Sequence, residues 1–177
     1  TQMVNELLEL SKIESGRFSL DRSPVAPCNL LSSASQRMQL QAERANLRLR
    51  IECADDLPNV QIDTQRLEQV LVNLYLNALD AMLAGGHLTV GAQLDGTGDL
   101  PNTVVITVAD TGHGISGDDM QKIFQPFFTA RKKAGMGLGL SICERIIRNH
   151  GGKIEVETEQ GQGTLFRIRL PVKSLSQ

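Results

Sequence analysis

The sequence has few aromatic residues and no long apolar segment. It contains no tryptophan, one tyrosine and five phenylalanines among 177 residues. No run approaches the ~20 apolar residues that a membrane-spanning helix needs, and the N-terminus lacks the basic and then apolar order of a signal peptide. We therefore expect a cytoplasmic chain that makes no membrane contact of its own, with any membrane anchor belonging to a longer parent protein.

A strong excess of one charge is also absent. The 18 basic and 20 acidic residues give a formal net charge of -2 and an isoelectric point near 5.9. Proteins that bind nucleic acid usually present a clear excess of basic residues to the phosphates. The composition therefore predicts no nucleic-acid partner.

Cysteine is scarce. The three cysteines, Cys28, Cys53 and Cys143, are odd in number and fit no metal-ligand spacing. Structural disulfides are rare in cytosolic proteins. We therefore expect three reduced, packed thiols and no zinc site.

Helical spacing of apolar residues predicts several helices. One covers residues 2–14, a second covers about 30–45 with Asn29 as its N-cap, and a third runs from its cap Asp63 to about Ala84. A further helix follows the glycines at 135–139. The chain starts at Thr1 within a helical pattern, which suggests a piece of a longer protein, and two prolines make residues 17–27 an extended linker.

Alternating apolar residues predict strands in the remainder. Such runs occur at 47–53, 88–94, 104–108, 153–159 and 164–170, and the last four form two hairpins. A brief apolar run also covers residues 60–62. With 41% apolar residues, one core is expected. The predicted fold is an α/β two-layer sandwich, in which about three helices cover one face of a mixed, mostly antiparallel sheet.

The helix that begins at Asp63 carries one polar stripe. At 100° per residue, five polar residues fall within about 80° of arc, namely Arg66, Gln69, Asn73, Asn77 and Asp80. A solvated helix face is the simpler explanation, but asparagine is a mediocre helix former and a solvated face more naturally uses Glu, Lys or Gln. Amide and carboxylate oxygens one turn apart suit Mg²⁺, whose shell is completed by water and phosphates.

Two glycine-rich segments flank a basic stretch. In VADTGHGI at 108–115, Asp110 is either part of a simple turn or an acceptor for a flat donor edge that Gly112 and Gly114 allow to approach. Gly135, Gly137 and Gly139 precede a helix, and a helix N-terminus attracts anions. The sequence contains no Walker A loop, no Rossmann fingerprint and no H-R-D or D-F-G element.

Together these motifs resemble the GHKL ATPase superfamily and, within it, the catalytic and ATP-binding domain of bacterial two-component sensor histidine kinases. NLYLNALDAM at 73–82 resembles the asparagine box, and DTGHGI at 110–115 and GMGLGLS at 135–141 resemble two glycine boxes. IFQPFFT at 123–129 is similar to the phenylalanine box, and GQGT at 161–164 to the final glycine motif. The resemblance implies a dimerisation-hairpin helix over residues 1–16, a linker over 17–27 and an ATP-binding domain over 28–177.

The resemblance also implies cofactors and residue roles. ATP and Mg²⁺ are the expected cofactors, with Asn77 binding the metal, Asn73 near the phosphates and Asp110 recognising the adenine amino group. Arg131, Lys132 or Lys133 is expected to meet the γ-phosphate. The full set of expected nucleotide-binding residues is Asn73, Asn77, Asp80, Asp110, Gly112, Gly114, Ile115, Phe128, Arg131, Lys132, Lys133, Gly135, Gly137, Leu138, Gly139 and Thr164.

Two departures refine the expected activity. Asn73 stands where hydrolysing relatives carry a glutamate base, which favours phosphoryl transfer over hydrolysis. The H-E/D-x-x-x-P box of the phosphoacceptor histidine is absent, so this chain is expected to bind ATP without phosphorylating itself. Expected partners are a histidine-bearing dimerisation domain, in a homodimeric parent, and a response regulator receiver domain. The alternatives are a nucleotide-binding regulatory module and a serine kinase of the anti-sigma-factor type.

Overall fold

The computed structural model describes residues 19–95, 102–129 and 137–172. Its helices are α2 (Pro27–Arg44), α3 (Thr64–Ala81), α4 (Gly117–Met120) and α5 (Gly139–Asn149). Its strands are β1 (Ser23–Val25), β2 (Leu47–Cys53), β3 (Val60–Ile62), β4 (Gly86–Asp95), β5 (Thr103–Asp110), β6 (Lys153–Glu159) and β7 (Gly163–Pro171). The helix expected over residues 1–16 lies outside the described residues. No helix in the described ranges is long and apolar enough to cross a membrane.

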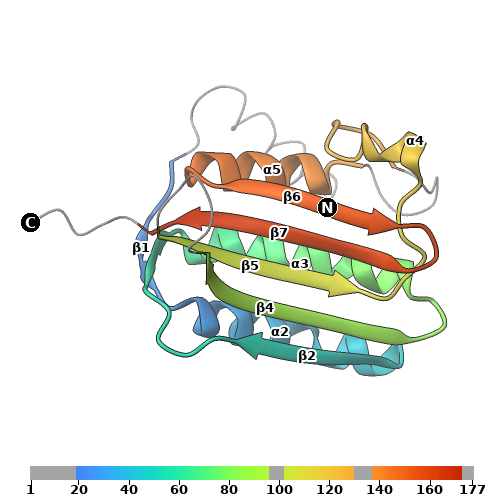
Figure 1. The fold of residues 1–177 in the computed structure, drawn as a ribbon, viewed down its shortest axis with the longest axis horizontal. Helices are drawn as coiled ribbons and strands as arrows, with labels where there is room; N and C mark the ends of the chain where they lie inside the picture. Colours follow the sequence, from blue (N-terminus) through green and yellow to red (C-terminus); the bar gives the residue numbers. More distant parts are fainter. Residues whose placement is uncertain (1–18, 96–101, 130–136, 173–177) are drawn as a thin grey trace, which may run out of the picture.

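Five strands form one sheet in the order β2-β4-β5-β7-β6. β2 runs parallel to β4, and the other neighbouring pairs are antiparallel. The helices α2, α3 and α5 lie behind this sheet in Figure 1, which leaves its other face uncovered by these helices. The predicted two-layer sandwich with a mixed, mostly antiparallel sheet is confirmed.

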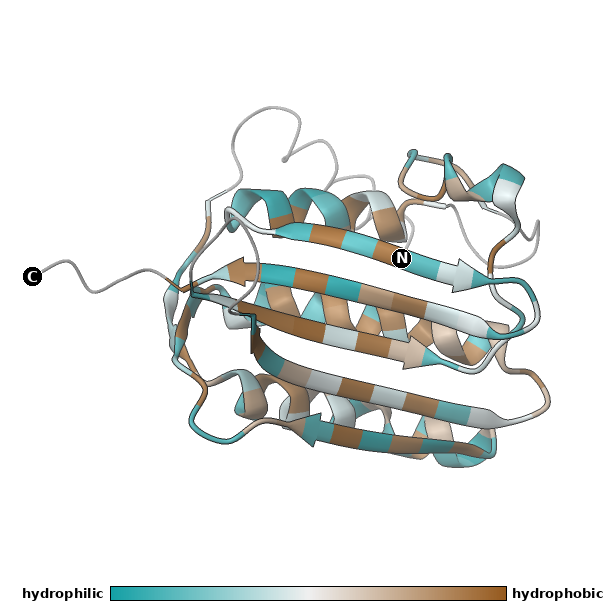
Figure 2. Ribbon diagram, in the orientation of Figure 1, coloured by the Kyte–Doolittle hydropathy of each residue, from teal (hydrophilic) through white to brown (hydrophobic). Residues whose placement is uncertain are grey.

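The strand pattern explains why the helices cover one face only. In β5, Val104, Ile106 and Val108 belong to the core beneath the helices, whereas Thr107 alternates onto the opposite face. Figure 2 shows the resulting alternation of brown and teal along the strands. The period of two therefore assigns one side of the sheet to the core.

Helix α3 begins and packs as predicted. Asp63 is its N-cap, and the Asp63 carboxylate accepts a hydrogen bond of 3.1 Å from the Arg66 backbone N–H. The apolar side is buried against the sheet and α2, and it consists of Leu67, Leu71, Leu74, Ala78 and Met82. Each buried leucine contributes about 1.5–3 kcal/mol relative to an exposed one. Burial of this side directs the polar stripe away from the core, although the helix ends at Ala81 rather than Ala84.

The predicted start of the second helix was wrong. Helix α2 begins at Pro27 with Ala26 as its N-cap, and no side chain caps it. Proline suits the first helical position because its fixed φ fits a helix and its missing N–H would have no partner there. Asn29 therefore lies inside the first turn instead of before it.

The expectation of three reduced thiols was also wrong. Cys28, in the first turn of α2, and Cys53, at the end of β2, form a disulfide with a Cα–Cα distance of 5.8 Å. The two residues are 25 positions apart, so the bond closes a loop that contains the helix and the strand. Only the tertiary packing of α2 on β2 brings them together. Cys143 is buried and forms no disulfide.

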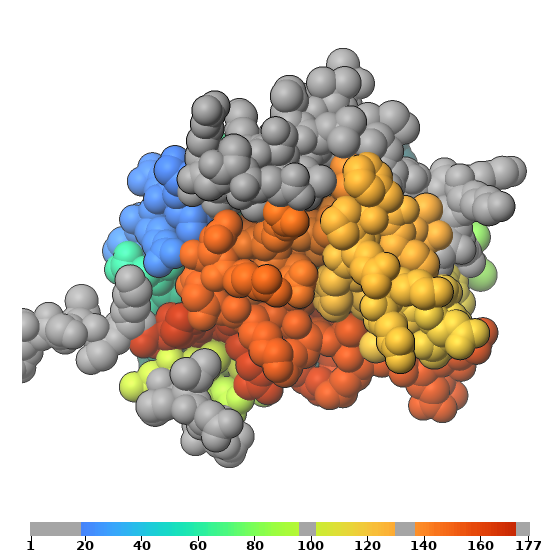
Figure 3. All heavy atoms as spheres, turned by 90° about the horizontal axis from the view of Figure 1, so that it is seen from above, coloured from blue at the N-terminus to red at the C-terminus, as the bar shows by residue number. Residues whose placement is uncertain are grey.

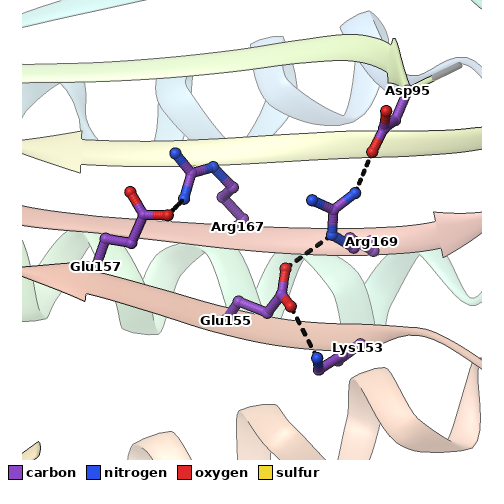
Figure 4. Close-up of polar contacts among 6 residues, drawn as sticks. All are labelled: Asp95, Lys153, Glu155, Glu157, Arg167 and Arg169. Carbon is purple, nitrogen blue, oxygen red and sulfur yellow. Dashed lines mark hydrogen bonds and ion pairs between the residues drawn. The ribbon is translucent and has the colours of Figure 1, made fainter. Parts of the chain in front are cut away.

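The face of the sheet opposite the helices carries a ladder of ion pairs (Figure 4). Arg169 on β7 contacts Asp95 on β4 and also Glu155 on β6, with a distance of 2.7 Å to the second. Lys153 lies 2.8 Å from the same glutamate. Exposed ion pairs of this kind stabilise weakly, by about 0–1 kcal/mol each. The ladder is therefore best regarded as a charge-balanced surface.

The segment before α2 is extended and joins the domain. β1 pairs with β3 in an antiparallel register, and the Asp21 backbone N–H donates to the Asp63 carboxylate over 3.1 Å. The Arg22 guanidinium donates to the backbone carbonyl of Asn149 at the end of α5. This part of the expected linker is thus attached to the ends of two helices.

His150 is buried where the start of α3 meets the end of α5, and it links these two helices. It is 4% exposed; one ring nitrogen, Nε2, accepts from the Asp63 backbone N–H over 3.0 Å, and the other, Nδ1, contacts the Ile146 carbonyl over 2.7 Å. These contacts require the neutral ring with its proton on Nδ1. Burial is the main cause that lowers the pKa of His150; Arg22 also lowers it, whereas the Ile146 hydrogen bond and Asp63 oppose the change.

The lowered pKa predicts that His150 makes stability depend on pH. Below pH ~6.5 the unfolded chain binds a proton that the folded chain excludes, so the contribution of His150 is complete above that pH and is lost as pH falls toward the folded pKa. The free energy of unfolding, measured in urea from pH 7.5 to 5, should fall more steeply for the native chain than for His150→Gln. A His87→Gln control removes an exposed histidine and should keep the native slope; identical slopes for all three would contradict the role of His150.

Candidate functional site

The polar stripe of α3 meets the N-terminus of α5. Asn73 is half-buried, and a Cβ added to Gly139 would lie 2.5 Å from Asn73 Nδ2 and 2.6 Å from its Oδ1. Real Cβ atoms do not approach other atoms this closely, so any larger residue at position 139 would displace the Asn73 amide. The asparagine box and the second glycine box, about 65 residues apart in the sequence, therefore touch.

Asp110 is half-buried at the end of β5. Its Oδ1 accepts a hydrogen bond of 2.8 Å from the Gly112 backbone N–H. Burial raises the pKa of Asp110, while hydrogen bonds from the backbones of Gly112 and Thr164 and the charge of His113 oppose the rise. A partly desolvated carboxylate with fixed orientation suits recognition of a neutral hydrogen-bond donor such as an amine.

The loop after Asp110 packs on the last turn of α3. A Cβ on Gly112 would lie 2.6 Å from the Ala81 Cβ, and the His113 backbone N–H donates to the Ala81 carbonyl over 3.2 Å. Ala81 is one helical turn beyond Asn77. The structure thus places the Asp110 loop beside the turn of α3 that carries Asn77 and Asp80.

The end of β6 and the turn between β6 and β7 contact this loop. Gly114 has a φ of +70°, and a Cβ there would lie 2.3 Å from the Glu159 carbonyl. The Ile115 backbone N–H donates to the Thr158 hydroxyl over 2.9 Å, and that hydroxyl lies 3.2 Å from the hydroxyl of the buried Thr164. Ile115 and Thr164 therefore help to shape the loop through packing and hydrogen bonds to neighbouring strands.

Near Gly137, the predicted site packs against the phenylalanine box, residues 123–129. Gly137 has a φ of +70°, and a Cβ there would lie 2.3 Å from the Phe128 carbonyl. Phe128 packs against the core and Leu138 is fully buried. Figure 3 shows the segment around α4, in gold, beside α5, in orange. Both ends of the stretch from Asp110 to Ser141 are thus fixed to the domain.

Two further predicted site residues lie on the polar side of α3, where Asn77 is half-buried and Asp80 is exposed. Arg131, Lys132, Lys133 and Gly135 lie outside the described residues, so the γ-phosphate contact stays a prediction.

Two residues that contact the predicted site were not predicted from the sequence. Ala81 receives the Asp110 loop, and Cys143 accepts a hydrogen bond of 3.3 Å from Asn73 Nδ2. Cys143 is one turn beyond Gly139, so helical spacing could have indicated that both face α3. No such signal exists for Ala81, whose role depends on its backbone carbonyl.

A shallow groove elsewhere on the sheet shares none of these residues. It has a volume of about 310 Å³ and is lined by Glu52, Cys53, Ala54, Gly91, Ala92, Gln93 and Thr107. The predicted site instead surrounds the polar stripe of α3. The groove is therefore not the place where the motifs converge.

Comparison with known proteins decides the family. Residues 62–174 match the family described as histidine kinase-, DNA gyrase B- and HSP90-like ATPases. The chain belongs to this ATPase family. Its match includes the asparagine box, both glycine boxes and the final glycine motif, and the predicted family is thereby confirmed.

Curated relatives of this ATPase domain are sensor histidine kinases. The chain is 37% identical over 171 residues to the alginate biosynthesis sensor protein KinB of Pseudomonas aeruginosa, covering 96% of this chain and 28% of KinB. It is 39% identical over 171 residues to the sensor histidine kinase ZraS of Escherichia coli K12, covering 97% of this chain and 35% of ZraS. The chain therefore spans about a third of the length of these relatives.

Solved structures agree with the fold. Full-length ShkA in complex with AMPPNP has a TM-score of 0.86 and 29% identity, covering 99% of this chain and 36% of ShkA. The catalytic domain of histidine kinase ThkA has a TM-score of 0.72 and 31% identity, covering 85% of this chain and 95% of that domain. The chain is thus an ATP-binding catalytic module of the histidine kinase type.

The geometry at Asp110 predicts its importance for nucleotide binding. Asp110→Asn replaces carboxylate oxygen with an amide and should lower ATP affinity at least about ten-fold, since a hydrogen bond to a charged group is worth about 1.5–3 kcal/mol. Titration calorimetry measures the change, and Asp118→Asn, which alters an exposed acid on α4, should bind like the native chain. Unchanged affinity in Asp110→Asn would remove this residue from the site.

Proposed function

We propose that this chain binds Mg-ATP and transfers the γ-phosphate to a histidine on a dimerisation hairpin, for relay to a response regulator. The observation that supports this most strongly is the convergence on α3. Gly139 lies against Asn73, and the Gly112 loop lies against Ala81 two turns further along the same helix. One helix thus connects the predicted phosphate end of the site to its predicted adenine end.

The donor groups present fit a magnesium ion. Asn77 supplies an amide oxygen on the polar side of α3, and Asn73 supplies another one turn earlier. Mg²⁺ prefers oxygen ligands and commonly shares its shell with phosphates and water, and when bound it neutralises phosphate charge. Because an amide ligand is neutral, the phosphates would supply most of the negative charge around the ion.

The same helix favours transfer over hydrolysis. Asn73 occupies the position one turn before Asn77, and its amide cannot accept a proton from water at neutral pH. Its Nδ2 instead donates a hydrogen bond of 3.3 Å to the Cys143 sulfur. The site therefore positions the nucleotide and provides no general base at Asn73.

The histidines of this chain do not suit the role of acceptor. His150 is buried and both of its ring nitrogens contact backbone groups. The Nδ1 of His113 lies 2.6 Å from the Gly114 carbonyl within the glycine loop, and His87 lies on β4. We therefore assign the acceptor to a dimerisation domain, with a homodimeric parent protein as the context.

This function predicts phosphoryl transfer between separate domains. The chain, mixed with labelled ATP, Mg²⁺ and the separately produced hairpin domain of its parent, should produce acid-labile phosphohistidine on the hairpin. Asn77→Ala should lower the initial rate about ten-fold or more through loss of the metal ligand, whereas Asn29→Ala on the exposed side of α2 should not.

The residue that carries the label also distinguishes this function from the two alternatives, a regulatory module and a serine kinase. A regulatory module would bind ATP and leave the hairpin unlabelled. A serine kinase would produce acid-stable phosphoserine on another protein. Either result would contradict histidine phosphorylation.

A further inference from the structure

Cys143 lies on α5, one turn after Gly139, and is 1% exposed. Its sulfur accepts a hydrogen bond of 3.3 Å from Asn73 Nδ2. The Sγ also donates toward the Val70 carbonyl on α3 over 3.9 Å. The thiol therefore connects α5 to α3 at two places on the latter helix.

These two contacts determine which end of the Asn73 amide faces the thiol. A thiol has one proton, and a contact with the Val70 carbonyl uses that proton because a carbonyl oxygen can only accept. Sulfur is thus left as an acceptor, which pairs with the NH₂ end of the amide and not with its oxygen. Oδ1 is the other end of the same planar amide and so points away from the sulfur, while the amide as a whole lies beside Gly139.

We propose that Cys143 is a positioning residue that orients the Asn73 amide oxygen toward the phosphate and metal end of the site. This role rests on the proposed function, in which an oxygen, and not an NH₂ group, should face a cation. An amide presents opposite hydrogen-bonding character at its two ends. Without the sulfur, Asn73 would lose the hydrogen bond that favours this orientation of its amide over the flipped one.

The test compares nucleotide affinity in matched variants. Cys143→Ala removes the acceptor and should lower Mg-ATP affinity about three- to ten-fold, the range of one neutral hydrogen bond, while adenosine affinity stays unchanged. Cys143→Ser keeps an acceptor and a donor and should restore Mg-ATP affinity to within about two-fold. Ile146→Val removes a buried methyl group from the same helix and should bind like the native chain.

A double-mutant cycle distinguishes orientation from general destabilisation. In an Asn73→Ala background, Cys143→Ala should cause no further loss of Mg-ATP affinity, because its target side chain is gone. An equal loss in both backgrounds, or a loss no greater than that of Ile146→Val, would overturn the positioning role. Failure of the native chain to bind Mg-ATP would instead overturn the proposed function, and this role with it.

Discussion

The close approach of glycine backbone to α3 is the constraint on which the site depends. At Gly139 and at Gly112, the space that a Cβ would need is already filled by Asn73 and Ala81. Glycine therefore permits two segments distant in sequence to reach the same helix. Because both contacts are made by backbone, they position N–H groups and loop carbonyls next to the polar stripe without long side chains between them.

Contacts in the core hold α3 in the position that both glycine segments reach. Tyr75 is fully buried, and its hydroxyl lies 3.3 Å from the Ser35 hydroxyl on α2. Burial is the main cause that raises the pKa of Tyr75 to about 12, with the Ser35 hydrogen bond opposing it. Glu68, also buried, contacts Arg37 at 2.9 Å across the same helix pair. Polar groups that lose water at this interface thus keep partners, which fixes the rotation of α3 about its axis.

The features predicted correctly were those encoded by local pattern. Period-two alternation located the five strands of the sheet, and Asp63 marked the start of α3 because a cap acts within three residues. The glycine boxes were found because strained or close-packed backbone requires glycine at those positions. These signals extend over a few neighbouring residues and need no knowledge of tertiary contacts.

The features that were missed depend on residues distant in the sequence. The Cys28–Cys53 disulfide needs the end of β2 to lie beside the start of α2, and Cys143 meets Asn73 only after α5 packs on α3. The start of α2 was misplaced for a local reason, since Asn29 is a good cap residue but Pro27 fixes the first turn. Composition and spacing alone could not choose between these competing signals.

The central claim, that one nucleotide site is organised along α3, is tested most directly by nuclear magnetic resonance during titration with ADP. We expect the Gly112 and Gly139 backbone amides to shift with ADP, and the side-chain amides of Asn73 and Asn77 to shift further when Mg²⁺ is added. Gly91, in the groove on the sheet, should not move. Shifts concentrated at Gly91, with Gly112 and Gly139 unchanged, would contradict a nucleotide site on α3.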